Sequence, residues 1–504
     1  MENNVIIRME KTVKRFPGVI ALQDVDFTLL KGEIHALVGE NGAGKSTLVK
    51  ILDGVFPPTE GKISIDGKIT RIESPLHAKK LGISMIHQEL MLAEPLSAAE
   101  NILLGNLPRR KVVGIVNWQE AKRRAKQLLE HLGVELDINR PVQQLSIAQR
   151  QMIEIARALT LNARVFILDE PSSFLSRQEL RVLFSLIKSL QDKGCSVIYI
   201  SHRLEEIFQI ADRVTVLKDG KLMGTLPINE VSREKLIKLM TGRELREFYP
   251  SKEGRKRGEE VLRVQNLSWD HRLFEVNLKV HKGEIHGIYG LMGSGRTELA
   301  KVLFGRFLRK SGEVAINGEK IKVRHPKDAI RSGIAYVPED RHREGVISEL
   351  SVGENISIIR RNQDKKKLFP LVNKSQEKKQ TAELITQLAI RTPSGRQKVK
   401  FLSGGNQQKV VLAKWLNGIN SQVIMFDEPT RGIDVGTKSQ IYRIMDGLAR
   451  KGKALILISS ELPEILGLSD KILVMARGKI VGEFTGDTSE EEILACALKG
   501  KEGV

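Results

Sequence analysis

Short apolar runs alternate along this chain with longer segments in which apolar residues recur every three or four positions. The runs IHALVG at 34–39, VFILDE at 165–170 and SVIYIS at 196–201 are typical of buried strands. The segment QEAKRRAKQLLEHLG at 119–133 is typical of an amphipathic helix. Strands that alternate with helices usually form a parallel sheet covered by helices, so the pattern predicts an α/β fold.

The whole pattern occurs twice. Residues 31–48 read KGEIHALVGENGAGKSTL, and residues 282–299 read KGEIHGIYGLMGSGRTEL. Further along, ISHRLEEI at 200–207 is repeated as ISSELPEI at 458–465. Self-similarity of this kind, at a nearly constant offset, indicates a tandem duplication.

A polar segment separates the two copies. Residues 246–260 contain proline and glycine and show no apolar period, which is typical of a linker. We therefore predict a first domain at 1–245, a linker at 246–260 and a second domain at 261–504.

The first copy carries a phosphate-binding motif. Residues 39–46 read GENGAGKS, which matches G-x-x-x-x-G-K-[ST], and they lie between an apolar run and a helical segment. Glycines let backbone N–H groups converge on phosphate oxygens, Lys45 supplies a mobile cation to the β and γ phosphates, and the Ser46 hydroxyl can ligate magnesium. We predict nucleotide binding by Gly39, Glu40, Asn41, Gly42, Ala43, Gly44, Lys45, Ser46 and Thr47.

The corresponding loop of the second copy, residues 290–297, reads GLMGSGRT. It keeps Gly290, Gly293, Gly295 and Thr297 but has Arg296 where Lys45 stands in the first copy. Arginine keeps the charge, yet it is bulkier and planar and cannot act as a compact point charge. We expect this loop to bind nucleotide and to support slower hydrolysis.

Two apolar runs end in paired carboxylates, VFILDE at 165–170 and VIMFDE at 423–428. A buried strand ends in this way where its carboxyl end meets a phosphate site. Asp169 and Asp427 are placed to hold magnesium, directly or through water. Glu170 and Glu428 are then candidates to polarise the attacking water, a general-base role.

In the second copy, residues 402–407 read LSGGNQ, which resembles the signature motif of ABC ATPases. The segments MIHQEL at 85–90 and YVPEDR at 336–341 resemble the family's Q-loop, so the resemblance covers nearly the whole chain. It implies a P-loop NTPase fold with two tandem ABC-type nucleotide-binding domains, each with a mainly parallel sheet core and a helical signature subdomain. It also implies ATP and Mg²⁺ as cofactors.

The resemblance assigns roles to single residues of the first copy. Gln88 matches the Q-loop glutamine, which implies a catalytic role and, together with Ser46 and Asp169, magnesium binding. His202 matches the switch histidine and would act in catalysis beside Glu170, Gln88 and Lys45. Phe16 matches the aromatic residue that stacks on adenine, although a phenylalanine there could equally belong to the core.

In this family two domains pack head to tail, so the resemblance implies that each ATP lies between one copy's phosphate loop and the other copy's signature. The first site then joins the first copy's loop to Ser403, Gly404, Gly405 and Gln407. We expect this site to hydrolyse ATP, because it lacks none of the family's residues.

The second site departs from the family pattern at several positions, and we expect it to be slow and mainly structural. Glu339 and Ser460 replace the glutamine and the histidine, and Ser146 is followed by Ile147 and Ala148 instead of glycines. The same site would use Gly290, Gly293, Gly295, Arg296, Thr297, Asp427 and Glu428. The D-loop pattern is followed by GID at 432–434, whereas residues 173–176 depart from it.

The stretches GLMGSGRTE, YVPEDR and LSGGNQQKV closely resemble the ATP-binding subunits of bacterial monosaccharide importers for ribose, galactose, arabinose or xylose. This resemblance implies a membrane-spanning permease and, through it, a sugar-binding protein as partners, with peripheral association at the cytoplasmic face of the inner membrane. Importers of nucleosides or autoinducers with the same architecture remain an alternative. A ribosome-associated tandem ABC ATPase is less compatible, because such proteins have a long charged linker and two intact sites.

Composition fits this interpretation. Of the 504 residues, 41% are hydrophobic and 28% charged, and no apolar run approaches the ~20 residues that span a bilayer. The net charge of +20 is spread among acidic residues, which favours a mildly membrane-attracting surface, and we expect no nucleic-acid partner. The scattered Trp118, Trp269 and Trp415 are expected to be packing residues. The N-terminal segment lacks the features of a secretory signal, and Cys195 and Cys496 are expected to be structural thiols in a reducing cytosol.

Overall fold

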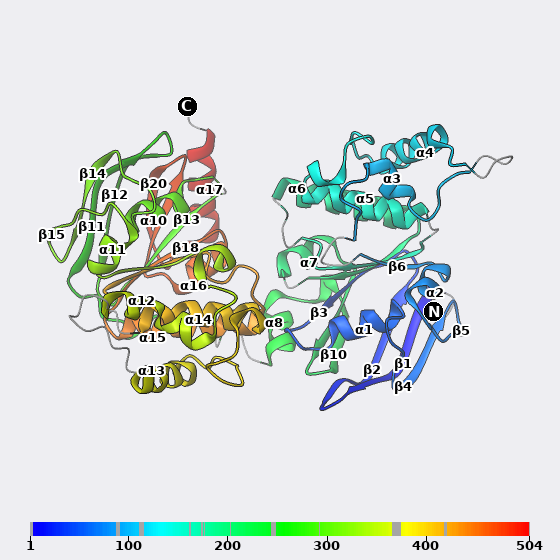
Figure 1. Ribbon diagram of the computed structural model, residues 1–504, viewed down its shortest axis with the longest axis horizontal. Helices are drawn as coiled ribbons and strands as arrows, with labels where there is room; N and C mark the ends of the chain where they lie inside the picture. Colours follow the sequence, from blue (N-terminus) through cyan, green and yellow to red (C-terminus); the bar gives the residue numbers. More distant parts are fainter. Residues whose placement is uncertain are drawn as a thin grey trace. The chain divides into compact units, whose positions relative to one another are not determined.

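The computed structural model forms two compact units, Met1–Leu245 and Arg246–Val504 (Figure 1). It describes residues 4–86, 91–109, 115–160, 163–172, 175, 177–201, 203–242, 248–291, 293–364, 374–417 and 421–502. Each unit contains a six-stranded and a four-stranded sheet with helices, so the predicted tandem α/β fold is confirmed.

In the first unit the six-stranded sheet has the order β10-β9-β3-β8-β7-β6. Strands β3, β6, β7, β8 and β9 are mutually parallel, and β10 runs antiparallel to β9. Its strands are β3 (Ile34–Val38), β6 (Ile83–Ile86), β7 (Val165–Asp169), β8 (Ser196–Ile200), β9 (Arg213–Lys218) and β10 (Lys221–Pro227). Strands β3 and β8 are buried along their whole length, which explains why they appear as unbroken apolar runs.

The four-stranded antiparallel sheet of the first unit has the order β2-β1-β4-β5. Its strands are β1 (Val5–Phe16), β2 (Val19–Leu30), β4 (Glu60–Ile65) and β5 (Lys68–Ile69). One hydrophobic core joins the two sheets to the helix that follows β3. That helix is therefore held on one side by apolar packing, which fixes where its N-terminus lies.

The helices of the first unit are α1 (Lys45–Leu52), α2 (Pro75–Lys80), α3 (Ala98–Leu103), α4 (Trp118–His131), α5 (Ile147–Thr160), α6 (Arg177–Asp192), α7 (Leu204–Ile210) and α8 (Arg233–Thr241). Helix α4 confirms the helix expected at 119–133, and its N-terminus is capped by the Asn117 side chain. Helix α3 packs against α4 and α5, and the three form a helical layer beside the sheet (Figure 1).

The second unit repeats this architecture element by element. Its six-stranded sheet, in the order β16-β17-β18-β13-β19-β20, contains β13 (Ile285–Gly290), β16 (Ile334–Val337), β17 (Val423–Asp427), β18 (Ala454–Ser459), β19 (Lys471–Ala476) and β20 (Lys479–Thr485). Its antiparallel sheet, in the order β12-β11-β14-β15, contains β11 (Glu260–Trp269), β12 (Leu273–His281), β14 (Ser311–Ile316) and β15 (Glu319–Lys320). The matching strand order reflects the duplication that the sequence predicts.

Eight α-helices complete the described part of the second unit. They are α10 (Arg296–Leu303), α11 (Pro326–Arg331), α12 (Val352–Asp364), α13 (Lys374–Gln387), α14 (Gly404–Leu416), α15 (Val435–Arg450), α16 (Leu462–Leu468) and α17 (Glu490–Glu502). Helix α12 packs against α13 and α14 and forms the helical layer of this unit. Across both units, none of the helices that the structure describes has the length and apolar character needed to span a bilayer.

The segment 246–260, interpreted as a linker, is anchored to the second unit at Arg255. This side chain is only 3% exposed and forms ion pairs with Asp446 at 2.9 Å and Asp470 at 3.2 Å. It also donates a hydrogen bond to the Leu468 carbonyl at 2.7 Å. The part of this segment around Arg255 is therefore held against the second unit.

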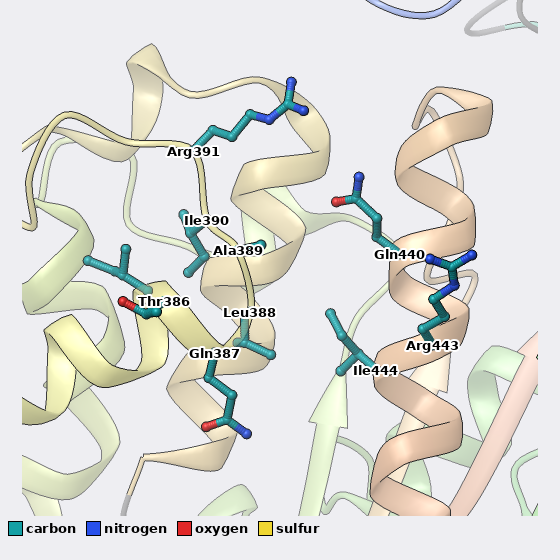
Figure 2. Close-up of a pocket in the computed structure, with 10 residues that line it drawn as sticks. Thr386, Gln387, Leu388, Ala389, Ile390, Arg391, Gln440, Arg443 and Ile444 are labelled. Carbon is teal, nitrogen blue, oxygen red and sulfur yellow. The ribbon is translucent and has the colours of Figure 1, made fainter. Parts of the chain in front are cut away.

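A cavity of about 510 Å³ lies between the end of α13 and helix α15 (Figure 2). Figure 2 shows Gln440 and Ile444 of α15 on one side and Leu388 and Ile390 on the other. Beside this cavity, the Lys409 ammonium donates to the Ala389 carbonyl at 2.8 Å and to Gln440 at 2.6 Å. Lys409 belongs to α14, so it ties the helical layer to α15.

Candidate functional site

The topology of the first unit brings the predicted site segments to one edge of the sheet. Strands β3, β8, β7 and β6 are parallel neighbours, so their carboxyl ends lie on the same side. The phosphate loop follows β3, Asp169 ends β7, and the segments containing Gln88 and His202 follow β6 and β8. Gln88 and His202 themselves lie outside the described residues.

The phosphate loop requires glycine where it approaches other backbone. A Cβ atom at Gly39 would lie 2.2 Å from the Leu217 carbonyl oxygen, which is far inside van der Waals contact. Gly44 has φ 103°, a left-handed conformation, and a Cβ there would lie 2.7 Å from the Leu22 side chain. These contacts pin the loop against the core immediately before α1 begins.

The Lys45 cation contacts carbonyl groups of its own loop. The side chain is buried, and its ammonium donates to the Gly39 carbonyl at 2.7 Å and to the Glu40 carbonyl at 3.0 Å. Ser46 is exposed and Thr47 half-buried at the start of α1. The loop thus presents a lysine cation, a hydroxyl and a helix N-terminus together, which is the chemistry that binds phosphate and a divalent cation.

The glutamates after the acidic strands share an unusual backbone conformation. Glu170 has φ 48° and Glu428 has φ 46°, both in the left-handed region that non-glycine residues avoid. Their N–H groups donate to the carbonyls of Ile200 at 3.0 Å and Ile458 at 2.9 Å. Such a residue costs on the order of 1–3 kcal/mol, and these residues cluster at functional sites. The same turn geometry therefore occurs at the matching position of both copies.

In the second unit, Arg296 reaches away from its loop. Its guanidinium donates to the carbonyl of Ser459, at the end of β18, and pairs with the Glu428 carboxylate at 3.5 Å. Burial raises the pKa of Glu428 to about 7, and Arg296 and a hydrogen bond with Ser460, at the switch-histidine position, offset this only in part. The carboxylate that would polarise water is therefore engaged by two neighbours in this copy, one of which is the arginine that replaces lysine.

Asp427 is fully buried beside the hydroxyl that follows Arg296. Thr297 donates to one of its oxygens at 3.1 Å, and the Tyr336 hydroxyl donates to the other at 2.8 Å. Burial raises the pKa of Asp427 to about 6, although these hydrogen bonds and Arg296 act in the opposite direction. A threonine hydroxyl next to a carboxylate is a set of hard oxygen donors of the kind that magnesium prefers.

The signature helices of the two units begin differently. In the second unit Ser403 precedes α14 and makes no side-chain cap, while Asn406 donates to its hydroxyl at 2.9 Å. In the first unit the Ser146 hydroxyl accepts from the Gln149 N–H at 3.3 Å, and the Ser146 N–H donates to the Gln149 side chain at 3.0 Å. Ser146 is thus occupied by a reciprocal cap, whereas Ser403 leaves the first-turn N–H groups of α14 without one.

Both signature glycines lie close to side chains of their own unit. A Cβ at Gly404 would lie 2.6 Å from a guanidinium nitrogen of Arg341, and a Cβ at Gly405 would lie 2.3 Å from the Thr437 methyl. Gln407 is buried and donates to the carbonyls of Leu402 at 3.2 Å and Val399 at 3.3 Å, so it supports the signature loop from within its own unit. The side chains of Ile147 and Ala148, at the matching positions of the first copy, lie outside the described residues.

Phe16, the candidate adenine-stacking residue, lies at the end of β1 and is 39% exposed. It meets Phe56 edge-on at 5.3 Å between ring centroids. Because so much of the ring is open to solvent, the alternative of a core phenylalanine does not fit this position.

A buried carboxylate that the sequence interpretation missed supports the switch segment in each unit. Glu206 accepts hydrogen bonds from Ser172 at 2.7 Å, Ser201 at 2.8 Å and Tyr199 at 2.9 Å. In the second unit Glu464 accepts from Thr430 at 3.0 Å and from Ser459. Both glutamates stand at the same place in ISHRLEEI and ISSELPEI, and this coincidence was the signal that could have revealed them.

The family model described as "ABC transporter" matches the chain twice, at residues 22–173 and 273–431, which together make up more than half of it. The chain belongs to the ABC transporter family. Both matched regions run from the antiparallel sheet through the phosphate loop to the acidic strand end. Each unit of this ABC protein is therefore one ABC domain.

Curated relatives match the ABC protein over almost its whole length. "Ribose import ATP-binding protein RbsA" of Clostridium perfringens is 46% identical over 491 residues, which cover 97% of each chain. "Xylose import ATP-binding protein XylG" of Thermoanaerobacter pseudethanolicus is 46% identical over 507 residues, covering 98% of this chain and 99% of the relative.

Among solved structures, the complex of an archaeal ribosomal stalk protein with the archaeal ribosome recycling factor aABCE1 contains a similar tandem chain. The match has a TM-score of 0.61 and 21% identity, and it covers 97% of this chain and 92% of that one. At this level of identity the likeness shows a shared fold alone.

The ABC protein should lose stability with rising pH because of Glu428. Burial raises the pKa of this carboxyl from its ordinary 4.5 to about 7, and Arg296 offsets only part of that effect. Between these two values the folded state holds a proton that the unfolded chain has released, so the free energy of unfolding falls as pH rises through this window, by at most about 3 kcal/mol.

Glu428→Gln removes this ionisation. Relative to the wild type, the variant should therefore gain free energy of unfolding between about pH 5 and pH 8. Urea unfolding of the full chain at the two pH values measures the change. Parallel pH profiles for the two proteins would show that Glu428 titrates normally.

Proposed function

We propose that this chain is the ATP-hydrolysing subunit of a monosaccharide importer, in which only one of two ATP sites turns over rapidly. The family and the names of the ribose and xylose relatives support the transport class, and they favour sugars over nucleosides or autoinducers. The observation that carries the asymmetry is the Arg296–Glu428 pair, in which the residue that replaces the loop lysine engages the carboxylate that would polarise water.

In this proposal the chain works at the cytoplasmic face of the cell membrane, bound to a membrane-spanning permease and, through it, to a sugar-binding protein. ATP binding draws the two domains together and hydrolysis releases them. The sugar contacts the other subunits, so this chain supplies the free energy of the cycle.

The first site is shared between the copies. Phe16 stacks on the adenine, residues 39–47 hold the phosphates, and the second copy's Ser403, Gly404 and Gly405 cover the γ-phosphate. The N–H groups at the start of α14 suit this role because Ser403 leaves them uncapped. Gln407 contributes by holding the loop that carries these residues.

Magnesium fits the oxygen donors present at this edge of the sheet. Ser46, Asp169 and Gln88 would hold it in the first copy, and Thr297 and Asp427 already lie together at the matching place in the second. The bound ion would neutralise charge on the phosphate oxygens. Glu170 accepts a proton from the attacking water, and His202 holds the γ-phosphate and the water in line.

The second site binds nucleotide and contributes mainly to holding the domains together. Arg296 and Ser460 engage Glu428, and burial favours its protonated form, which cannot act as a base near neutral pH. On the other side of this ATP, the first copy's signature offers Ser146, whose hydroxyl is occupied by its own helix cap.

Reconstitution tests the transport class. The full chain and its permease in lipid vesicles should show ATPase activity that rises several-fold when sugar-loaded binding protein is added, with ribose and xylose binding proteins tried first. Nucleoside-loaded binding protein serves as the control for specificity. Recovery of the chain with ribosomes, and its absence from washed membranes, would contradict this function.

A further inference from the structure

Arg341 joins two segments of the second unit that the proposed first ATP site depends on. It begins η4 (Arg341–Gly345), a short π-helix that follows the Glu339 segment. One guanidinium nitrogen donates to the Arg431 carbonyl at 3.0 Å, in the turn that leads into the D-loop. Another lies so close to Gly404 that a Cβ there would approach it to 2.6 Å. One rigid, planar group thus touches both the D-loop turn and the start of the signature helix.

The surroundings of Arg341 are unusual for an arginine. Burial lowers its pKa, and Asp340 offsets this only in part. Its Nε atom is shielded from solvent and has no hydrogen-bond partner, and within the described part of the chain its side chain forms no ion pair. A cation beside the N-terminus of α14 is also opposed by the helix dipole. These costs indicate that the side chain is kept for the contacts that it makes.

The rest of the segment is fixed to the same parts of the unit. Glu344 pairs with Lys301 of the phosphate-loop helix α10 at 2.9 Å, and Lys414 of the signature helix donates to the Gly345 carbonyl. Glu339 forms an ion pair with the Arg431 side chain, immediately before the D-loop. Residues 339–345 therefore connect the Q-loop position, the D-loop turn and the signature helix.

The first copy has no counterpart of this arrangement in its sequence. Leu90 and Ser173 stand where Arg341 and Arg431 stand in the second copy. The arginine pair thus occurs only in the copy whose signature keeps its glycines, which is the copy that would serve the hydrolytic site.

We propose that Arg341 is a positioning residue for the first ATP site. It holds Gly404 and the D-loop turn in register with each other, so that the start of α14 meets the γ-phosphate of ATP bound on the first copy's loop. This inference rests on the proposed sharing of that site between the copies.

Steady-state ATPase assays of the full chain with its permease in vesicles test the proposal. Arg341→Met should lower kcat about 10- to 100-fold, as expected when a reacting geometry is displaced by about 1 Å. The KM for ATP should change little, because the loop that binds the phosphates belongs to the other copy. Arg341→Lys should recover part of kcat, since an ammonium can donate to the Arg431 carbonyl but cannot fill the guanidinium's second contact.

Arg343→Met is the matched control. Arg343 lies in the same π-helix, its side chain is 88% exposed, and it pairs with Asp340 at 3.7 Å, so its removal should leave kcat unchanged. The proposal is overturned if Arg341→Met keeps the wild-type kcat. It is equally overturned if kcat falls only in proportion to the unfolded fraction measured by circular dichroism.

A second variant, Ser403→Arg, shows whether a negative result concerns only Arg341 or the shared ATP site as a whole. If Ser403→Arg stops turnover and Arg341→Met does not, only the role of Arg341 is wrong. If Ser403→Arg leaves turnover intact, the shared site itself is wrong and the inference falls with it.

Discussion

Replacing Glu170 with glutamine should reduce steady-state ATP turnover by about 10²- to 10⁴-fold, whereas replacing Glu428 should leave most of it intact. Glutamine keeps the size and hydrogen bonding of the side chain but cannot accept a proton from water. In the second unit we expect Glu428 to be a poor proton acceptor even in the wild type. It is paired with Arg296 at 3.5 Å, and burial raises its pKa to about 7.

The two variants are matched controls for each other. Both residues follow an acidic strand end, and both adopt the same left-handed backbone conformation, with φ 48° and 46°. Release of inorganic phosphate at saturating ATP gives kcat for each. Losses of similar size would show that the sites work alike and would remove the asymmetry from the proposed function.

Placing an arginine in the signature should also affect ATP turnover very differently in the two copies. Ser403→Arg should lower turnover by about two orders of magnitude or more, because the side chain would occupy the space through which the N–H groups of α14 reach the γ-phosphate. Ser403 is exposed and does not cap its own helix, so the substitution leaves the fold of the second unit undisturbed.

Ser146→Arg, the equivalent change in the first copy, should leave more than half of the turnover. It removes the reciprocal cap with Gln149, which costs about 1 kcal/mol of helix stability. Thermal unfolding of each variant separates that loss from an effect on catalysis. A greater loss of turnover from Ser146→Arg than from Ser403→Arg would show that the working site uses the first copy's signature instead, and would contradict the proposal.

The features that the sequence could predict are those in which neighbouring residues act together. A phosphate loop, an apolar strand that ends in two carboxylates and a signature motif are each contiguous, and their spacing repeats. The parallel sheet could be expected for the same reason, since β3, β7 and β8 are short runs buried on both faces.

The features that sequence reasoning missed depend on contacts between distant positions. Arg296 could be recognised as a departure from lysine, but its reach to Ser459 and Glu428 follows from how β17 and β18 lie beside α10. The buried carboxylate of Glu206 accepts from Ser172, which is far away in the chain. The role of Arg255 likewise could not be read from neighbouring residues, because its partners Asp446 and Asp470 are far away in the chain.

The central claim is that the working ATP lies between the first copy's phosphate loop and the second copy's signature. Vanadate trapped with ADP occupies the γ-phosphate position, and irradiation then cuts the backbone beside it. Mapping the cuts in the full chain by mass spectrometry tests the claim directly. We predict cuts within residues 39–46 and at Ser403; cuts at Ser146 or within residues 290–297 would contradict it.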